Sequence, residues 1–461
     1  MGVTPTATGA TSGTSAAAAA VVVVNVVEQY EKGTLNLAGT LGHLDHREQA
    51  LLRALWRKLL EVFKDNKPAL AAASKASGDG SATTAKRSER ALRQNAKPLD
   101  TAKSSGGWFG FGASTAKSEP IEYRQTVSAV APASSQPPAF AADGGIHTIR
   151  DAFWAATLYD HPDVMILRFL RARKWKVDEA LEMLVACLRW RVEEEVDWLI
   201  WHGELALNHG LLRRGIGAVH KSDRLGQPVL HIPVRMNDPS AQPREQIVDY
   251  TIFLMEVARS LLHPPVEKVC LLFDTTDMSI SNMDWAFFRT FLNYLEHYYP
   301  ECLGVVIIYN ASWVFNKLWK LICPLLDPVV ASKVNFVNSA AELQKFIAPD
   351  ALPTEFGGAS VFKYDYMLPV AGENNQMHDD DARLKAAEER RAECAEFERV
   401  TAKWASLADG APVDGLAALD DERGKAADRL VAISKTFDNS VRARTLYHRT
   451  GVIDSQLVVH L

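Results

Sequence analysis

Four cations interleaved with apolar residues occupy residues 168–175, which read RFLRARKW. Arginine and lysine bind phosphate well, arginine through a planar fork of donors and lysine as a compact charge. An anion site is therefore the chemistry that this segment offers. The alternative is a helix with a solvated basic face, or one whose arginines pair with neighbouring helices, and we expect this alternative for Arg168 and Arg171.

A second segment with a marked character runs from Trp313 to Ile322. Its spacing predicts an amphipathic helix that carries aromatic and aliphatic side chains on one side and Lys317 and Lys320 elsewhere. Such a helix is either an ordinary part of the core or a lid over an apolar cavity that can turn towards lipid.

Motifs of common catalytic and metal sites are missing from the sequence. It contains no GxSxG nucleophile elbow, no GxxxxGKS/T or GxGxxG phosphate loop after a strand, and no HExxH zinc motif. The 13 histidines are scattered, and His43 and His46 have no third zinc ligand nearby. We therefore expect neither an enzyme nor a metalloprotein.

The elements that must position these residues follow an α/β pattern. Continuous apolar runs at 269–273 and 303–309 predict buried parallel strands, and shorter strands are expected at 228–234 and 333–337. Helices are predicted between and after them at 245–262, 284–299, 313–326 and 340–347. Alternation of this kind indicates a mainly parallel sheet covered by helices.

Other parts of the chain flank this region. Helical patterns begin at Leu41 and again near residues 151, 162 and 177, whereas residues 1–38 and 67–145 have a composition typical of disorder. The second of these stretches contains Trp108, Phe109 and Phe111 among glycines. They are either a flexible segment of no consequence or a short docking or membrane-insertion element. The last part of the chain is predicted to be a separate, charged helical tail.

Composition limits where the protein acts and what it binds. With 51 Lys and Arg against 56 Asp and Glu, the net charge is −5, which argues against a nucleic-acid partner. The five cysteines form no CxxC pair, which is typical of reduced thiols in a cytoplasmic protein. No apolar stretch approaches the roughly 20 residues that span a bilayer, so we expect peripheral contact with endomembranes.

Several motifs, taken in order, resemble one known family. FLRARKW, the DRLGQPV turn, the segment from YYPECLG to ASKV, and LPTEFGG are similar to the CRAL-TRIO lipid-transfer family, and most of all to fungal phosphatidylinositol-transfer proteins of the yeast secretory type. The resemblance covers the helix near residue 41 and about 149 to 360. The first 38 residues and the tail lie outside it.

The resemblance implies a helical N-terminal subdomain beside an α/β domain with an apolar lipid pocket and an amphipathic gate helix. The expected organisation is a disordered N-terminus (1–38), the first helix of the helical domain (39–66), a disordered insertion (67–145), the rest of the helical domain (146–203), the lipid-binding domain (204–360) and the tail (361–461). The implied gate residues are Trp313, Phe315, Leu318, Trp319 and Ile322.

The family's inositol-phosphate site carries over to four residues of this sequence. By the resemblance, Arg173 and Lys174 would hold the phosphate, and Glu301 and Lys333 the inositol hydroxyls. The family's threonine three residues before that lysine is Val330 here, so one hydroxyl contact is lost.

The polar residues of the family's phosphatidylcholine site, in contrast, are replaced in this sequence. Its two tyrosines fall on Val219 and Leu230, and its serine and threonine fall on Val269 and Leu271. Aliphatic residues cannot satisfy a buried phosphocholine, because an unpaired buried polar group is costly. The resemblance therefore implies phosphatidylinositol binding with weak phosphatidylcholine binding.

Three functions remain open from the sequence. The first is a phosphatidylinositol-transfer protein, expected to be a monomer without a cofactor, which presents its lipid to lipid kinases and has a second apolar ligand such as a sterol or squalene. The second is a membrane-recruited adaptor or lipid sensor that binds partners through the insertion and the tail. The third is an enzyme or a haem carrier on the same fold, and haem would need an axial ligand that the sequence does not place.

Overall fold

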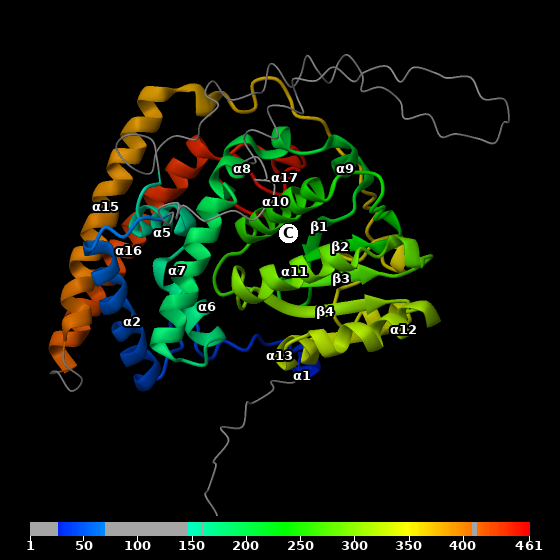
Figure 1. Ribbon diagram of the computed structural model, residues 1–461, viewed down its shortest axis with the longest axis horizontal. Coiled ribbons are helices and arrows are strands. Elements are labelled where there is room, and N and C mark those ends of the chain that lie inside the picture. Colours follow the sequence, from blue (N-terminus) through cyan, green and yellow to red (C-terminus); the bar gives the residue numbers. More distant parts are fainter. Residues whose placement is uncertain (1–25, 70–145, 159, 408–412) are drawn as a thin grey trace, which may run out of the picture.

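The computed structural model describes residues 26–69, 146–158, 160–407 and 413–461. A group of helices lies on one side of the molecule, and a sheet with its own covering helices lies on the other (Figure 1). Predictions for residues 1–25 and 70–145, including those for Trp108, Phe109 and Phe111, lie outside the described residues. Within the described ranges, no helix has the length and apolarity needed to span a bilayer.

The helical side is built on α2 (His46–Lys64), α5 (Ile149–Thr157), α6 (Pro162–Ala172) and α7 (Val177–Glu193). Asp45 and Glu48 form a capping box that starts α2, and Pro162 opens α6 at a position where its missing N–H is harmless. Leu55, Trp56 and Leu59 recur at helical spacing on α2 and are fully buried. These four helices confirm the predicted helical subdomain.

The C-terminal region is helical, as predicted, but it is not a separate tail. Helices α15 (Asp380–Ser406) and α16 (Val413–Val441) form a hairpin that packs against α2 and α5 (Figure 1). Phe397 and Trp404 of α15 join the same core as Trp56. The apolar stripe that makes this contact is narrow, and the many charges around it concealed it in the sequence.

The sheet has five strands in the order β1 (Ala218–Ser222), β2 (Pro228–Pro233), β3 (Val269–Asp274), β4 (Leu303–Tyr309) and β5 (Val334–Val337). Strands β2 to β5 are parallel, as predicted, and β1, which we did not predict, pairs with β2 in an antiparallel hairpin. The mainly parallel α/β domain is therefore confirmed.

The order of the strands decides which face each connecting helix covers. The parallel strands are neighbours in chain order, so right-handed crossovers place α10 (Arg244–Ser260), α11 (Trp285–His297) and α12 (Trp313–Ile322) on the same face. Leu271, Val306 and Ile308 point to this face. Their neighbours Cys270 and Ile307 point to the other, because side chains alternate along a strand.

Helix α1 (Val26–Lys32) covers the opposite face together with α14 (Ala340–Leu343). Buried Tyr30 packs on Phe346, with ring centroids 4.9 Å apart, and its hydroxyl donates to Asp223. The prediction of disorder for residues 1–38 is thus wrong from Val26 onward. The contacts that order this short helix come from residues far away in the sequence, such as Asp223 and Phe346.

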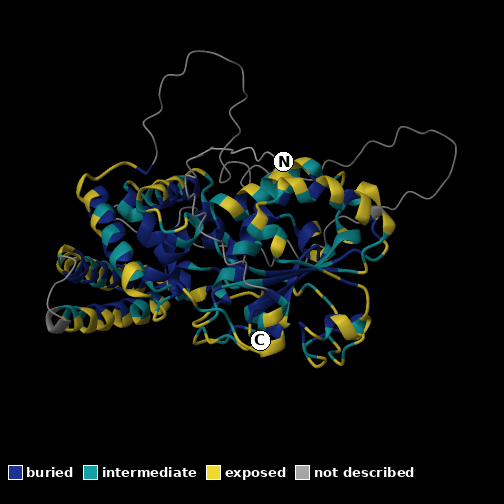
Figure 2. Cartoon of the chain, turned by 90° about the horizontal axis from the view of Figure 1, so that it is seen from below, coloured by how far each residue is buried: buried dark blue, intermediate teal, exposed yellow. Residues whose placement is uncertain are grey.

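The remaining helices frame the same domain. They are α8 (Val196–His202), α9 (His209–Arg214), α13 (Pro328–Ser332) and α17 (Leu446–Arg449). Tyr447 of α17 and Ile453 pack into the core between the sheet and α10, and the Tyr447 hydroxyl accepts the N–H of Val219 at 2.8 Å. In Figure 2 the strands appear as a buried layer between covering segments with exposed outer faces.

Candidate functional site

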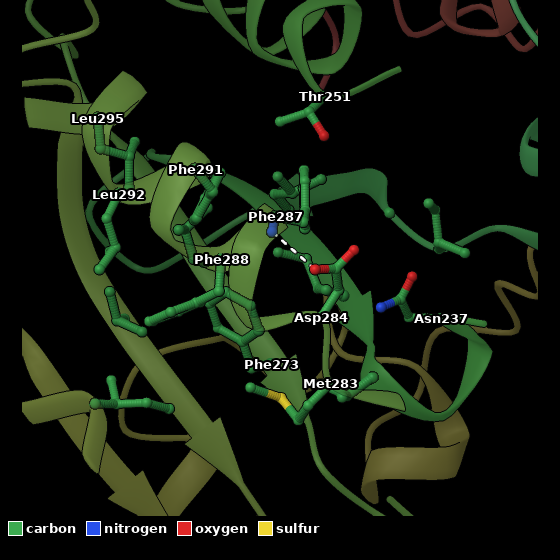
Figure 3. Close-up of a pocket in the computed structure, with 18 of the residues that line it drawn as sticks. Asn237, Thr251, Phe273, Met283, Asp284, Phe287, Phe288, Phe291, Leu292 and Leu295 are labelled. Atoms are coloured by element: carbon green, nitrogen blue, oxygen red, sulfur yellow. Dashed lines mark hydrogen bonds between the residues drawn. The ribbon is translucent and has the colours of Figure 1, made fainter. Parts of the chain in front are cut away.

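A cavity lies between the inner face of the sheet and helices α10, α11 and α12. It encloses about 1410 Å³ of atom-free space, including the part that is open to solvent. Figure 3 shows Phe287, Phe288 and Phe291 of α11 turned towards it, with Phe273 of β3 beside them. Most of the other lining residues are also aliphatic or aromatic.

Several polar residues of the lining already form hydrogen bonds within the protein. The Tyr250 hydroxyl donates to the Gly217 carbonyl and the Thr251 hydroxyl to the Ile247 carbonyl, both at 2.7 Å. Asp284 caps α11 by accepting the N–H of Phe287 at 2.9 Å (Figure 3), and the Asn237 amide donates to the Asn282 carbonyl at 2.8 Å. Since these groups already have partners, the cavity offers mainly a hydrocarbon-like surface.

Helix α12 forms one wall of the cavity. Phe315, Trp319 and Ile322 line it, and Leu318 is buried in the surrounding core. Trp313 instead faces solvent with 70% of its surface exposed, and the Lys317 ammonium lies 4.8 Å from the centre of its ring. Of the five predicted gate residues, the structure therefore places four on the inner side and one outside.

The four aliphatic residues at the predicted phosphatidylcholine positions separate into two pairs. Leu230 of β2 and Leu271 of β3 line the cavity. Val219 and Val269 belong to the same hydrophobic core but are not among the lining residues. Of these four residues, only Leu230 and Leu271 would therefore contact a ligand in the cavity.

The predicted headgroup residues Glu301 and Lys333 lie near the amino ends of β4 and β5, at the same edge of the sheet. The Val306 N–H donates to the Lys333 carbonyl at 2.9 Å, and the Lys333 ammonium donates to the Leu303 carbonyl at 2.8 Å. Leu303, Val330 and Val334 line the cavity. A molecule whose chains lie in the cavity would thus have this charged edge at one end.

Arg173 and Lys174 follow the end of α6 on the helical side. Arg171, two residues earlier, reaches the same edge of the sheet through an ion pair with Glu267 at 2.6 Å, and Arg168 pairs with Asp160 at 3.8 Å. Both arginines are thus paired within the protein, as expected, but with carboxylates in connecting segments rather than on neighbouring helices. Arg173 is half-buried and Lys174 exposed, and neither has an ion-pair partner among the residues that the structure describes.

Two of the predicted headgroup residues have unusual backbone geometry. Lys174 and Glu301 have φ values of +51° and +58°, in the left-handed region that side-chain-bearing residues seldom adopt. Such strain costs about 1–3 kcal/mol and clusters at binding sites.

Sequence reasoning missed Lys268, which stands directly before β3. Burial, with the charges of Lys333 and Arg171, lowers the pKa of Lys268 to about 8, while Glu301 and Glu267 oppose this shift. Its position in the sequence could have identified it. Lys268 directly precedes a buried strand, as Lys333 does, and the parallel strands of one sheet begin at the same edge.

This arrangement has the character of a binding site. Within the described part of the chain, no three His, Cys, Asp or Glu side chains gather as metal ligands would. The cavity can enclose hydrocarbon, and the charged edge can hold an anionic polar group.

Comparison with known proteins finds two matched domains and a set of similar sequences. Residues 212–358 match the CRAL/TRIO domain, and residues 115–186 match the CRAL/TRIO N-terminal domain. The chain is 35% identical over 318 residues to the CRAL-TRIO domain-containing protein C3H8.02 of Schizosaccharomyces pombe, covering 67% of this chain and 69% of that protein.

Two further similarities concern a transfer protein and a solved structure. The chain is 30% identical over 317 residues to the phosphatidylinositol transfer protein CSR1 of Eremothecium gossypii, covering 65% of this chain and 70% of that protein. The crystal structure of Sfh5 aligns with a TM-score of 0.37 and 18% identity, covering 45% of this chain and 76% of that one.

Proposed function

Because this chain belongs to the CRAL-TRIO family of lipid-binding and lipid-transfer proteins, we propose that it carries phosphatidylinositol between membranes. One lipid would occupy the cavity with its acyl chains against α10, α11 and the sheet. Its headgroup would lie at the charged amino edge.

The apolar cavity behind α12 is the observation that carries this proposal. Moving a 16-carbon chain from an apolar cavity into water costs roughly 12 kcal/mol of free energy, at about 0.8 kcal/mol per CH₂ group. A carrier must therefore enclose the chain in transit and open only at a bilayer. A wall formed by one amphipathic helix, with Phe315 and Trp319 inside and Trp313 outside, suits such an opening.

The charged edge supports an inositol phospholipid as the cargo. Arg173 and Lys174 would bind the phosphodiester, while Glu301 and Lys333 would accept from and donate to inositol hydroxyls. Phosphatidylcholine would bind weakly, because Leu230 and Leu271 offer its headgroup no polar partner. A second apolar ligand such as a sterol or squalene would need only the cavity.

Contact with the membrane would be peripheral and would involve the outer side of α12. Trp313 and Leu321 of α12 are exposed, as is Leu325 in the turn that follows, and Lys317 and Lys320 lie on the same helix. Aromatic rings favour the bilayer interface, and lysines favour an anionic surface. Acting as a cytoplasmic monomer at endomembranes, the protein would also present phosphatidylinositol to lipid kinases.

Transfer between vesicles, combined with lipid analysis, tests the proposal. We expect organic extraction of the purified protein to recover phosphatidylinositol as the main phospholipid. Charge reversal by Lys333→Glu should lower phosphatidylinositol transfer about tenfold, whereas Lys363→Glu at an exposed position should leave it unchanged. Recovery of mainly phosphatidylcholine, or full transfer by a folded Lys333→Glu variant, would contradict the proposal.

The adaptor hypothesis is tested by shortening the insertion. The Ala69 N–H donates to the His147 carbonyl and the Ile149 N–H to the Lys67 carbonyl, both at 2.9 Å, so the segments on either side of the insertion are already joined. Residues 70–114, which precede the matched N-terminal domain, can therefore be replaced by a short Gly-Ser linker. Transfer should survive this deletion if the protein is a carrier. The C-terminal region is unsuitable for deletion, because Phe397 and Tyr447 belong to the cores of the two domains.

A further inference from the structure

Lys268 is a half-buried cation at the charged edge that forms no ion pair with another described residue. The Val269 N–H donates to the Cys302 carbonyl at 2.8 Å, which places Lys268 beside Glu301 at the start of β4. Lys333 lies before the next strand, and its charge acts on Lys268. Among the described residues, no carboxylate lies within 4.0 Å of the Lys268 ammonium, because Glu267 pairs with Arg171 instead.

Two half-buried ammonium groups beside one carboxylate leave a local excess of positive charge. Lys268, Lys333 and Glu301, whose charges interact, carry a net charge of +1, and the predicted phosphate ligands Arg173 and Lys174 bring the total for the proposed headgroup site to +3. The phosphodiester of phosphatidylinositol neutralises only one of these charges. A phosphomonoester on the inositol ring adds about 1.5 to 2 negative charges at neutral pH, which brings the headgroup close to the charge of the site.

We propose that Lys268 completes a site for an inositol headgroup that bears a ring phosphate, so that the protein prefers a phosphatidylinositol phosphate to phosphatidylinositol. This inference rests on the proposed function and names its substrate class. The ring phosphate would lie between Lys268 and Lys333 at the amino ends of β3 and β5. Because both ammonium groups are partly buried, where the effective dielectric constant is lower than in water, charge-assisted hydrogen bonds to them are stronger than those to a fully exposed lysine.

Transfer of two lipids by the full-length protein tests the inference. Donor vesicles of phosphatidylcholine would contain either phosphatidylinositol or its 4-phosphate, and transfer of both would be measured for the wild type, Lys268→Gln, Lys268→Arg and Lys363→Gln. We expect the wild type, Lys268→Arg and Lys363→Gln to prefer the phosphorylated lipid. Lys268→Gln should reduce this preference about tenfold.

The outcomes separate this inference from the proposed function. A wild type that transfers neither lipid contradicts the proposed function. A wild type that transfers phosphatidylinositol without a preference, or a Lys268→Gln variant that keeps the preference, contradicts only the inference. Tight binding of soluble inositol 1,4-bisphosphate without extraction of the lipid would overturn a lipid as the ligand. Thermal unfolding of Lys268→Gln separates a local loss of binding from a folding defect.

Discussion

Arg423 of α16 and Asp163 of α6 form a buried ion pair across 260 positions of the chain. Two guanidinium N–H groups donate to the two carboxylate oxygens at 2.6 and 2.5 Å. Trp56 of α2 donates its indole N–H to the same carboxylate, and the guanidinium lies over the rings of Phe397 and Trp404. The Asp163 carboxylate thus links the C-terminal hairpin to helices α2 and α6 of the helical domain.

Replacing Arg423 by glutamine should destabilise the protein by about 3–5 kcal/mol. The substitution leaves Asp163 buried without its counter-ion, which is the costly way to break a buried pair. Urea denaturation followed by circular dichroism would measure the loss. Arg399→Gln on α15 is the matched control, because Arg399 pairs with Glu396 and Glu422 at the surface and should change the free energy of unfolding by at most about 1 kcal/mol. Equal stability of the two variants would contradict the anchoring role of the pair.

The same pair predicts a loss of stability in acid. Burial alone would raise the pKa of Asp163, but the charge and hydrogen bonds of Arg423 outweigh it and lower this pKa from 3.8 to about 2. Because the folded-state pKa is below the unfolded value, the contribution is present above pH 3.8 and is lost as pH falls towards 2. It amounts to about 2 kcal/mol. Denaturation between pH 5 and 2.5 should show a shallower decline for Arg423→Gln than for the wild type, and parallel declines would argue against this assignment.

The two tryptophans of α12 should respond differently to replacement by alanine. Trp313→Ala removes an exposed ring, so stability should change by no more than about 0.5 kcal/mol while transfer between anionic vesicles slows. Trp319→Ala removes half-buried cavity lining and should destabilise the protein by up to about 3 kcal/mol. Vesicle sedimentation and thermal denaturation separate the two effects. A Trp313→Ala variant with undiminished vesicle binding would remove this residue from the membrane-contact surface.

Affinity for a phosphorylated inositol lipid should fall as pH rises through about 8. Burial and the neighbouring Lys333 and Arg171, opposed by Glu301 and Glu267, lower the pKa of Lys268 to about 8, so its ammonium is lost above that pH. The second ionisation of a phosphomonoester, near pH 6, is already complete there. Lipid binding measured between pH 7 and 9.5 should therefore decline for the wild type. Lys268→Arg stays charged throughout and should show no such decline.

Local sequence patterns determined most of the elements of this protein. Apolar runs at 269–273 and 303–309 predicted the buried parallel strands β3 and β4, and helical spacing predicted α2, α10, α11 and α12. The motifs from FLRARKW to LPTEFGG also led to the family. These features are readable because periodicity and turn residues act over a few positions of the chain.

Packing between distant segments decided what the sequence left open. Helix α1 and the α15–α16 hairpin are ordered by partners such as Asp223 and Asp163, which lie 193 and 260 positions away. Only Leu230 and Leu271 of the four replaced positions line the cavity, because a side chain's surroundings depend on the helices that cover the sheet. Lys268 lies beside Glu301 because Val269 pairs with Leu303, whereas β5 starts opposite Val306, and Lys333 reaches back to the Leu303 carbonyl with its ammonium group. Register of this kind is a property of the assembled sheet rather than of any one segment.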